Sequence, residues 1–288
     1  MWTMHREAMT TDQPSRERTS NEGSLHTLRG DITGNPATWE EMLRDGPSSV
    51  DHVVLCAAPA RARGDTHAST YPAAARGALR IATLLGARTI IYTSSTGVYG
   101  VGDGSVVDES SAVSDADERV RALVEAEQLL LRGDTHNVVH GDVHDVSGKS
   151  TRRIVLRVAG LYGPGRDPAE RFRAADTRED DGARWCNFAW RDDVCSAVMH
   201  LQSDSAAISD ASRDANIFNV ADGHPVQARD ITSWLQREPA AQTNAKELRS
   251  TRSNQRVATD KLRATGWRPA VRTVFDGLVM LGHGPGAR

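Results

Sequence analysis

A serine turn after an apolar run is the first place where residue type and position favour chemistry. Ser94 and Ser95 directly follow the apolar residues 89–93. A hydroxyl at the carboxyl end of a buried parallel strand faces the crevice in which open α/β sheets bind ligands. The Ser95 hydroxyl is therefore a candidate for ligand binding. The alternative is a serine that caps the local turn.

Three histidines at four-residue spacing form a second candidate cluster. His136, His140 and His144 would share one face of a helix and could then bind a metal ion. They lie in the polar segment 132–153, which has no hydrophobic periodicity and contains glycines and aspartates. This composition favours an exposed loop insertion, so we expect no metal site there.

Short apolar runs predict the strands that must position such side chains. Residues 53–58, 89–93 and 154–158 are apolar on both faces, as expected of parallel strands covered by helices on both sides. Residues 73–85 and 118–131 between them have helical patterns. The alternation of strands and helices predicts an α/β fold with a Rossmann-like, doubly wound parallel sheet.

Composition narrows the class of protein. The 288 residues are 39% hydrophobic and carry a formal net charge of −3, which does not favour nucleic acid or a membrane as the main partner. The three cysteines form no C-x-x-C pair, and no apolar stretch approaches the ~20 residues of a membrane span. We expect a reduced, cytoplasmic protein, with import into an organelle as the alternative.

Seven short motifs occur in a fixed order between residues 30 and 269. They are Gly30-Asp31, Thr93–Gly100, Asp108-Glu109, Arg157–Arg166, Asn187–Val194, Asn219–Asp222 and Gly266–Pro269. In this order the chain resembles the extended and atypical short-chain dehydrogenase/reductase superfamily, and within it the NAD-dependent epimerase/dehydratase-like proteins. The resemblance implies a Rossmann-like core, a small C-terminal substrate region and NAD(P) as cofactor.

The resemblance also implies a cofactor site. Asp31 and Ile32 would lie beside the adenine, although Asp31 could instead be the N-cap of a helix around residues 39–43. Small residues would let the backbone pass close to the cofactor. These residues are Ala57, Ala58 and Pro59 after one strand, and Ala159, Gly160 and Leu161, which would lie near the nicotinamide.

On the substrate side, the resemblance implies that Ser95 hydrogen-bonds the reacting carbonyl or hydroxyl oxygen. The substrate-binding candidates are Tyr99, Tyr162, Trp190 and Arg191. The alternative for Tyr99 is a half-buried aromatic residue. We expect Asp192 and Asp193 to cap a helix over residues 194–201.

The glycine-rich turn that holds a dinucleotide pyrophosphate is absent from the sequence. None of the 24 glycines forms a G-x-G-x-x-G or G-x-x-G-x-x-G pattern. Residues 1–6 resemble the second strand of the fold, with Arg6 as a candidate contact for the 2′-phosphate of NADP or, alternatively, a surface arginine. We therefore expect an N-terminal truncation that removes the first strand, and doubtful NAD(P) binding by this chain.

The tyrosine–lysine pair of the superfamily is absent as well. No tyrosine has a lysine four residues after it. If residues 124–127 match the helix segment after the pair, Arg119 takes the tyrosine position and Leu123 the lysine position. Leucine has no proton to exchange, and arginine stays protonated in proteins.

These observations predict an organisation and a function. Residues 1–167 would form the nucleotide-binding core, with residues 132–153 as a polar insertion. Residues 168–288 would complete the core through residues 187–201 and form the substrate-side lobe. The expected function is NAD(P)-dependent epimerase/dehydratase-like or oxidoreductase-like activity on an unknown small carbonyl or sugar-like molecule. The alternatives are a non-catalytic nucleotide- or metabolite-sensing protein, and an inactive truncated product.

Overall fold

The protein forms two compact units. The computed structural model describes residues 2–5, 26–44, 46–133, 151–174, 180–203, 216–236 and 253–284. Unit 1 comprises residues 1–90 and 125–153, and unit 2 comprises residues 91–124 and 154–288. The predicted division of domains at residue 167 stays a prediction.

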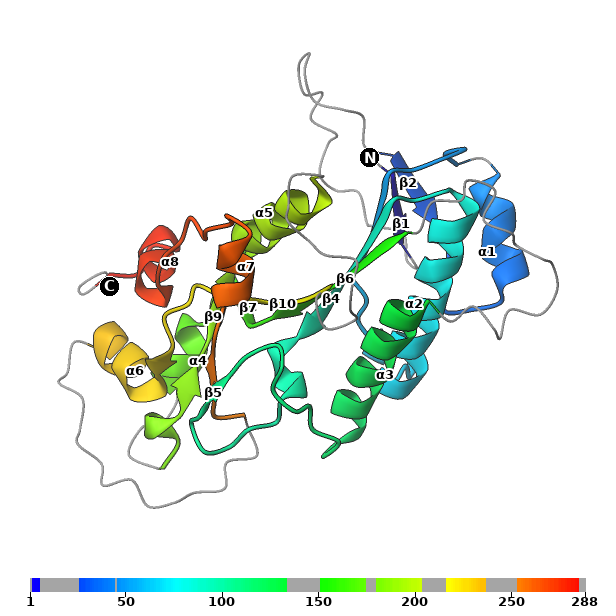
Figure 1. The fold of residues 1–288 in the computed structure, drawn as a ribbon. Helices are drawn as coiled ribbons and strands as arrows, with labels where there is room; N and C mark the ends of the chain where they lie inside the picture. The colour runs from blue at the N-terminus through cyan, green and yellow to red at the C-terminus, as the bar shows by residue number, and fades with distance from the viewer. Residues whose placement is uncertain are drawn as a thin grey trace, which may run out of the picture. The chain divides into compact units, whose positions relative to one another are not determined.

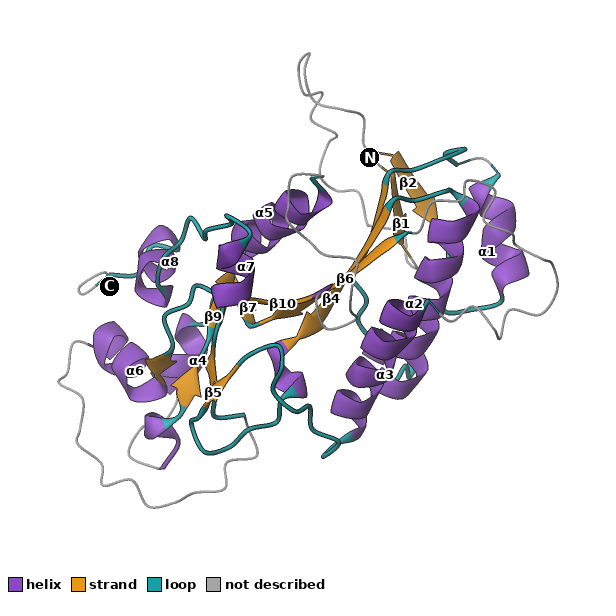
Figure 2. Cartoon of the chain, viewed as in Figure 1, coloured by secondary structure: helices purple, strands orange, loops and turns teal. Residues whose placement is uncertain are grey.

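The largest sheet of the described residues has four strands (Figures 1 and 2). Its strands are β3 (His52–Leu55), β4 (Thr89–Ser95), β6 (Arg152–Val158) and β10 (Ile217–Val220), in the order β10-β6-β4-β3. β6 and β10 are parallel, with Val155 opposite Ile217. Because helices lie between these strands in the chain, the topology is that of a Rossmann-like α/β fold, as the sequence predicts.

Unit 1 begins with a smaller parallel sheet of β1 (Trp2–His5) and β2 (His26–Arg29). Helix α1 (Pro36–Leu43) follows, and helix α2 (His67–Leu84) packs against β3. The Thr66 side chain caps α2 in a capping box with Ser69. The predicted strand over residues 53–58 ends three residues earlier than expected, at Leu55.

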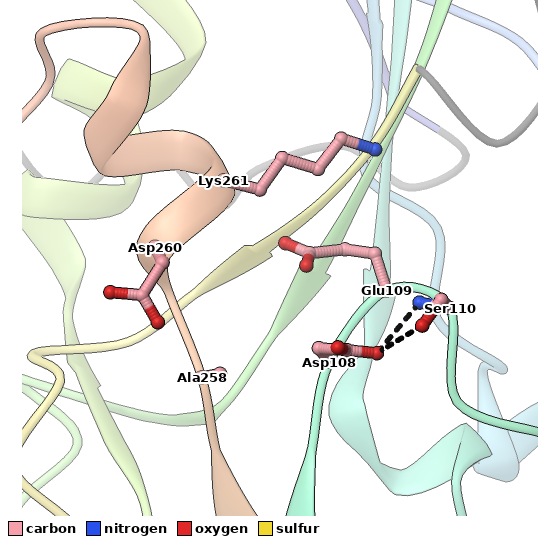
Figure 3. A pocket seen from close by; sticks show the side chains of 6 residues that line it. All are labelled: Asp108, Glu109, Ser110, Ala258, Asp260 and Lys261. Carbon is pink, nitrogen blue, oxygen red and sulfur yellow. Dashed lines mark hydrogen bonds between the residues drawn. The ribbon is translucent and has the colours of Figure 1, made fainter.

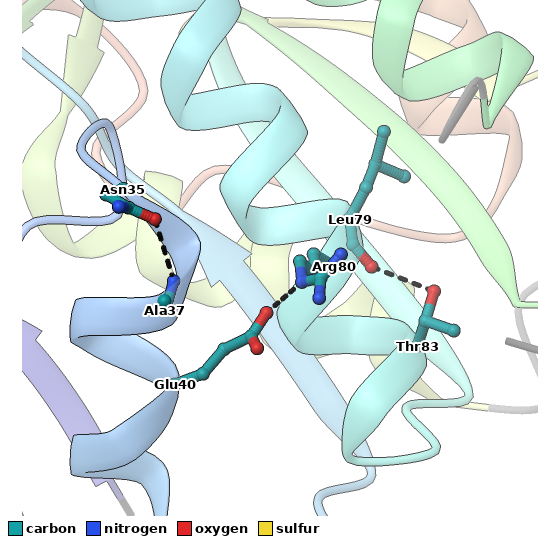
Figure 4. A network of polar contacts seen from close by, with 6 residues as sticks. All are labelled: Asn35, Ala37, Glu40, Leu79, Arg80 and Thr83. Atoms are coloured by element: carbon teal, nitrogen blue, oxygen red, sulfur yellow. Dashed lines mark hydrogen bonds and ion pairs between the residues drawn. The ribbon is translucent and has the colours of Figure 1, made fainter. Parts of the chain in front are cut away.

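An ion pair joins helices α1 and α2 of unit 1 (Figure 4). Arg80 of α2 pairs with Glu40 of α1, and within α2 the Thr83 hydroxyl donates to the Leu79 carbonyl at 3.0 Å. Gly77 lies against the turn that carries Asp31, since a Cβ on Gly77 would overlap the Ile32 carbonyl oxygen. The absence of a side chain at Gly77 therefore lets the Asp31 turn approach α2 closely.

Helix α3 (Glu118–Arg132) confirms the predicted helix almost residue for residue. Most of the predicted polar insertion, with its three histidines, lies outside the described residues. The insertion nevertheless ends earlier than predicted, because Arg152 and Arg153 belong to β6. The Arg152 N–H donates to the Arg88 carbonyl at 2.9 Å, so the strand ladder continues beyond the apolar run.

Within its described residues, unit 2 adds three short strand pairs and the helices α4 to α8. The pairs are β7 (Gly160–Tyr162) with β9 (Phe188–Trp190), β5 (Val106–Val107) with β12 (Arg256–Val257), and β8 (Trp185–Cys186) with β11 (Val226–Gln227). The helices are α4 (Ala169–Ala174), α5 (Arg191–Gln202), α6 (Ala228–Gln236), α7 (Asp260–Ala264) and α8 (Val274–Met280).

Two buried clusters lie in the described part of unit 2. One gathers apolar side chains of β6, β10 and α5 around Trp267, whose indole N–H donates to the Ser196 hydroxyl at 3.0 Å. The other is rich in aromatic residues and contains Tyr162, Phe172, Phe188 and Trp190. Among the helices of the described ranges, none is long and apolar enough to cross a membrane.

Candidate functional site

Ser95 ends β4 and caps the short helical turn that follows. Its Oγ accepts the Gly97 N–H at 3.1 Å, from an extended backbone conformation. A second hydrogen bond stabilises the turn, because the buried Gln255 amide donates to the Thr96 carbonyl at 2.8 Å. The Ser95 side chain therefore caps the turn. In this hydrogen bond Oγ is the acceptor. The hydroxyl proton of Ser95 therefore takes no part in the cap.

Arg119 lies beside this serine. A Cβ placed on Gly97 would lie 3.3 Å from Ser95 Oγ and 3.5 Å from Arg119 Nη1. Leu123, one turn further along α3, is buried. The helix thus brings the residue at the expected tyrosine position to the serine, but that residue carries a permanent positive charge instead of an exchangeable proton.

A buried polar network lies behind the turn. The Tyr99 hydroxyl donates to Asn219 Oδ1 at 2.7 Å, and the Asn219 N–H donates to Glu109 Oε1 at 2.7 Å. The buried Arg157 guanidinium stacks 4.9 Å from the centre of the Tyr99 ring. Burial raises the pKa of Tyr99, and burial also raises the pKa of Glu109.

The far end of this network opens into a cavity of about 340 Å³ (Figure 3). Its lining residues are Asp108, Glu109, Ser110, Ala258, Asp260 and Lys261. The Glu109 carboxylate is turned towards α7, which carries Asp260 and Lys261. The Asp108 carboxylate accepts both the N–H and the hydroxyl of Ser110, at 2.9 and 2.7 Å. Despite these carboxylates, no set of three side chains suited to a metal ion occurs in the part of the chain that the structure describes.

A buried acid follows β10. Asp222 is 3% exposed; its Oδ1 accepts the His224 N–H at 2.9 Å, while Oδ2 has no hydrogen-bond partner among the described residues. Burial raises the pKa of Asp222 to about 7. Asp222 is therefore a buried acid that titrates near neutral pH.

The predicted substrate residues occupy different environments. Tyr99 is fully buried, not half-buried, and Tyr162 and Trp190 pack edge to face with ring centres 5.2 Å apart. Burial raises the pKa of Tyr162. Arg191 is exposed and its Nε donates to Asp192 at 2.9 Å. A substrate role for these residues stays a prediction.

The predicted cofactor residues lie in both units and are described separately. In unit 1, Ala57, Ala58 and Pro59 begin one residue after the end of β3 and form a partly exposed stretch of irregular backbone. In unit 2, Ala159 is buried, and Gly160 is exposed in β7. Its Cβ position would lie 2.8 Å from the Asn187 carbonyl oxygen, so only glycine fits there. Arg6 lies outside the described residues.

One predicted helix cap, that of Asp192 and Asp193, is wrong, and the alternative of an N-cap at Asp31 is excluded as well. Asn35, not Asp31, is the N-cap of α1, and Asp31 Oδ1 instead accepts the Thr33 N–H at 2.9 Å. Asp193 lies inside the first turn of α5 without capping it. Its two oxygens accept the Ala270 and Val271 N–H groups at 2.7 and 3.0 Å. Asp193 thus ties α5 to a distant loop, a partner that its neighbours in sequence do not reveal.

Sequence reasoning assigned no role to three residues of the polar network. Glu109 and Asn219 were noted only as parts of motifs, and Arg157 only as the first residue of one. A signal for Arg157 was present, because a charged residue interrupts an otherwise apolar strand. Charged residues are rarely buried without a partner, so this pattern indicates a polar network in the core.

Comparison with known sequences gives partial matches to Protein YeeZ of two Escherichia coli strains. No family model matches the chain. Protein YeeZ of Escherichia coli strain K12 is 34% identical over 139 residues, which are 48% of this chain and 42% of YeeZ. The chain therefore matches less than half the length of this curated relative.

Solved structures match nearly the whole chain at low identity. MoeE5 in complex with UDP-glucose and NAD has a TM-score of 0.62 at 21% identity, over 96% of this chain and 87% of that structure. The dTDP-glucose 4,6-dehydratase of Bacillus anthracis in complex with NAD has a TM-score of 0.60 at 16% identity, over 88% and 77%. The Bordetella bronchiseptica enzyme WbmG in complex with NAD has a TM-score of 0.64 at 16% identity, over 98% and 85%. This chain therefore has the Rossmann-like fold of the NAD-binding epimerases and dehydratases, the fold of the extended short-chain dehydrogenases and reductases that its motifs resemble.

Proposed function

We propose that the protein carries out an NAD(P)-dependent epimerase/dehydratase-like or oxidoreductase-like reaction on a small carbonyl or sugar-like molecule. The observation that carries this proposal is the position of Ser95. Its hydroxyl stands at the carboxyl end of β4, is oriented by the Gly97 N–H, and retains a proton to donate. Neighbours with this fold were solved with NAD and with UDP-glucose, which supports both the cofactor and the class of substrate.

Ser95 is the proposed catalytic residue. Its hydroxyl would donate to the reacting oxygen of the substrate, and NAD(P), when bound, would supply the exchange of hydride. Substrate contacts are proposed for the four residues predicted from the motifs. These residues are Tyr99, Tyr162, Trp190 and Arg191.

The residues predicted to bind the cofactor are suited to only part of NAD(P). In unit 1, the small side chains of Ala57 and Ala58 would let a ligand approach the backbone, and in unit 2 the exposed backbone of Gly160 would do the same. Asp31 and Ile32, in a turn packed on α2, are the proposed adenosine contacts. For the pyrophosphate, however, the sequence has no glycine-rich turn. We therefore propose that this chain binds the cofactor weakly.

Titration calorimetry with NADH and NADPH tests this proposal. Losing contacts worth about 3 kcal/mol raises Kd roughly a hundredfold, so we expect saturable binding with a Kd of about 0.1 mM or weaker. Micromolar binding would mean that another segment holds the pyrophosphate. A folded protein that shows no saturable binding of either nucleotide at millimolar concentration would contradict the proposed function.

A further inference from the structure

We infer that Asp222 and Arg263 form a proton-dependent contact that positions helix α7. While Asp222 is protonated, the Arg263 guanidinium binds only the backbone of residue 222. When Asp222 loses its proton, the guanidinium also pairs with the side-chain carboxylate. Both residues belong to unit 2. The inference uses neither Ser95 nor a cofactor, so it is independent of the proposed function.

Arg263 already lies against the turn that carries Asp222. Its Nη2 donates to the Asp222 carbonyl oxygen at 2.7 Å. Gly223 permits this close approach, because its φ of 79° lies in the left-handed region and a Cβ there would overlap Arg263 Nη2. The guanidinium therefore lies next to the residue whose side chain it would pair with.

Each of the two residues has a buried polar atom without a partner. The Asp222 side chain is buried, and its Oδ1 accepts the His224 N–H, but Oδ2 has no hydrogen-bond partner among the described residues. In the same ranges of the chain, the buried Nε of Arg263 has none either. A buried polar group without a hydrogen bond is costly. Because one atom is an acceptor and the other a donor, an Asp222–Arg263 pair would satisfy both.

The charges around Asp222 decide in which protonation state this pair forms. Burial raises the pKa of Asp222 to about 7, so the side chain changes from a neutral acid to a carboxylate near neutral pH. Arg263 favours the carboxylate, and the other charged neighbours oppose it. The titratable groups around it in the described residues, besides Arg263, are Asp193 of α5, Asp276 of α8, Tyr162 of β7 and His224 of the same turn. The carboxylate therefore has a charged partner in Arg263, whereas the neutral acid needs none.

Helix α7 links this contact to the cavity of about 340 Å³. Arg263 lies in the second half of α7, while Asp260 and Lys261 at its start line the cavity (Figure 3). The helix spans only Asp260–Ala264 and packs against β10, which Asp222 follows closely. A new bond at Arg263 should therefore be felt at this wall of the cavity.

Nuclear magnetic resonance of the full chain between about pH 5 and 9 tests the inference. The probes are the Asp222 side-chain carboxyl carbon, the Arg263 Nε–H, and the backbone amides of Asp260 and Lys261. We expect the carboxyl carbon to titrate with a midpoint at about pH 7, and the other three signals to shift with the same midpoint. Asp222→Asn has nearly the same shape and no charge, so it should remove the common transition from those three signals.

Matched arginine variants separate the contact from general charge effects. Arg263→Gln should raise the Asp222 midpoint by about one pH unit, a roughly tenfold weaker acid, because the cation that stabilises the carboxylate is lost. Arg263→Lys keeps the charge and should raise the midpoint by less. Arg272→Gln, at an exposed arginine, should leave the midpoint unchanged.

Several results would overturn the inference. They are an Asp222 midpoint near its ordinary value of 3.8, an Arg263 Nε–H signal that does not move while Asp222 titrates, and equal midpoints in the parent and Arg263→Gln. A common transition that persists in Asp222→Asn would overturn it as well. Amides of Asp260 and Lys261 that do not follow the midpoint would overturn the link to α7. If Arg263→Gln fails to fold, the parent, Arg263→Lys and Asp222→Asn still decide between these outcomes.

Discussion

At the scale of single residues, the proton of Ser95 is the group on which turnover should depend. Ser95→Ala removes the proposed donor to the reacting oxygen but leaves β4 and its turn largely in place. We expect kcat to fall by about 10- to 1000-fold, the range for losing a positioned donor. Steady-state kinetics with UDP-glucose and NAD(P) as test ligands measures the effect, with the exposed Ser105→Ala as control. An unchanged kcat in Ser95→Ala would remove this residue from the site.

Asp222 should make stability depend on pH. Its pKa rises to about 7 on folding from an ordinary value of 3.8, so the folded state holds a proton that the unfolded state releases. The resulting stabilisation is fully present below about pH 4 and is lost as the pH rises to about 7. The loss is at most about 4 kcal/mol, at 1.4 kcal/mol for each pKa unit.

Asp222→Asn tests this pH dependence, because an amide has nearly the same shape and no charge. We expect the variant to lose much of the decline in stability between pH 5 and 8, and to be more stable than the parent at pH 8. Urea unfolding at several pH values measures this, with the exposed Asp230→Asn as the matched control. Parallel pH curves for the parent and Asp222→Asn would contradict the assignment.

At the scale of elements, the approach of α2 to the Asp31 turn depends on Gly77. Alanine is favoured over glycine within a helix by roughly 0.5–1 kcal/mol. At this position, however, its methyl group would overlap the Ile32 carbonyl oxygen. We expect the steric overlap to outweigh the gain in helix propensity. Gly77→Ala should therefore lower the free energy of unfolding by about 1–3 kcal/mol.

Thermal and urea unfolding measure the effect of Gly77→Ala. The control is Gly102→Ala, because a Cβ on Gly102 meets no atom within 4 Å. If the proposed role of Asp31 is correct, displacing its turn should also weaken the binding of NADH and NADPH. A more stable Gly77→Ala protein would show that helix propensity outweighs the close approach.

At the scale of the whole molecule, β3 is the end strand in the order of the four-stranded sheet. Its Val54 side chain is 41% exposed. An exposed apolar residue on an edge strand favours pairing with another molecule, and lysine there opposes it. We expect Val54→Lys to reduce concentration-dependent self-association and to change the free energy of unfolding by less than about 0.5 kcal/mol.

Sedimentation velocity over a range of protein concentrations measures this association. Met199→Lys is the matched control, because Met199 is 70% exposed on helix α5 and not on a strand. An equal decrease of association in both variants would indicate an effect of net charge rather than of the β3 edge. Association that does not change in Val54→Lys would contradict the prediction.

The sequence by itself determined the class of fold and the positions of its main elements. Helix α3 was predicted almost to its ends, and β4 and β6 were found from short apolar runs. These features depend on local periodicity, which a single segment contains in full. The order of the motifs added the likeness to NAD-binding epimerases and dehydratases, which the solved structures support at the level of the fold.

Only the tertiary structure decided which polar side chains meet. Glu109 bonds to the backbone of Asn219, 110 residues away, and Asp193 bonds to a loop 77 residues further along the chain. The place of Arg119 beside Gly97 likewise depends on how α3 approaches the end of β4. Such partners are chosen by packing between elements that are distant in sequence, and local patterns carry no information about that choice.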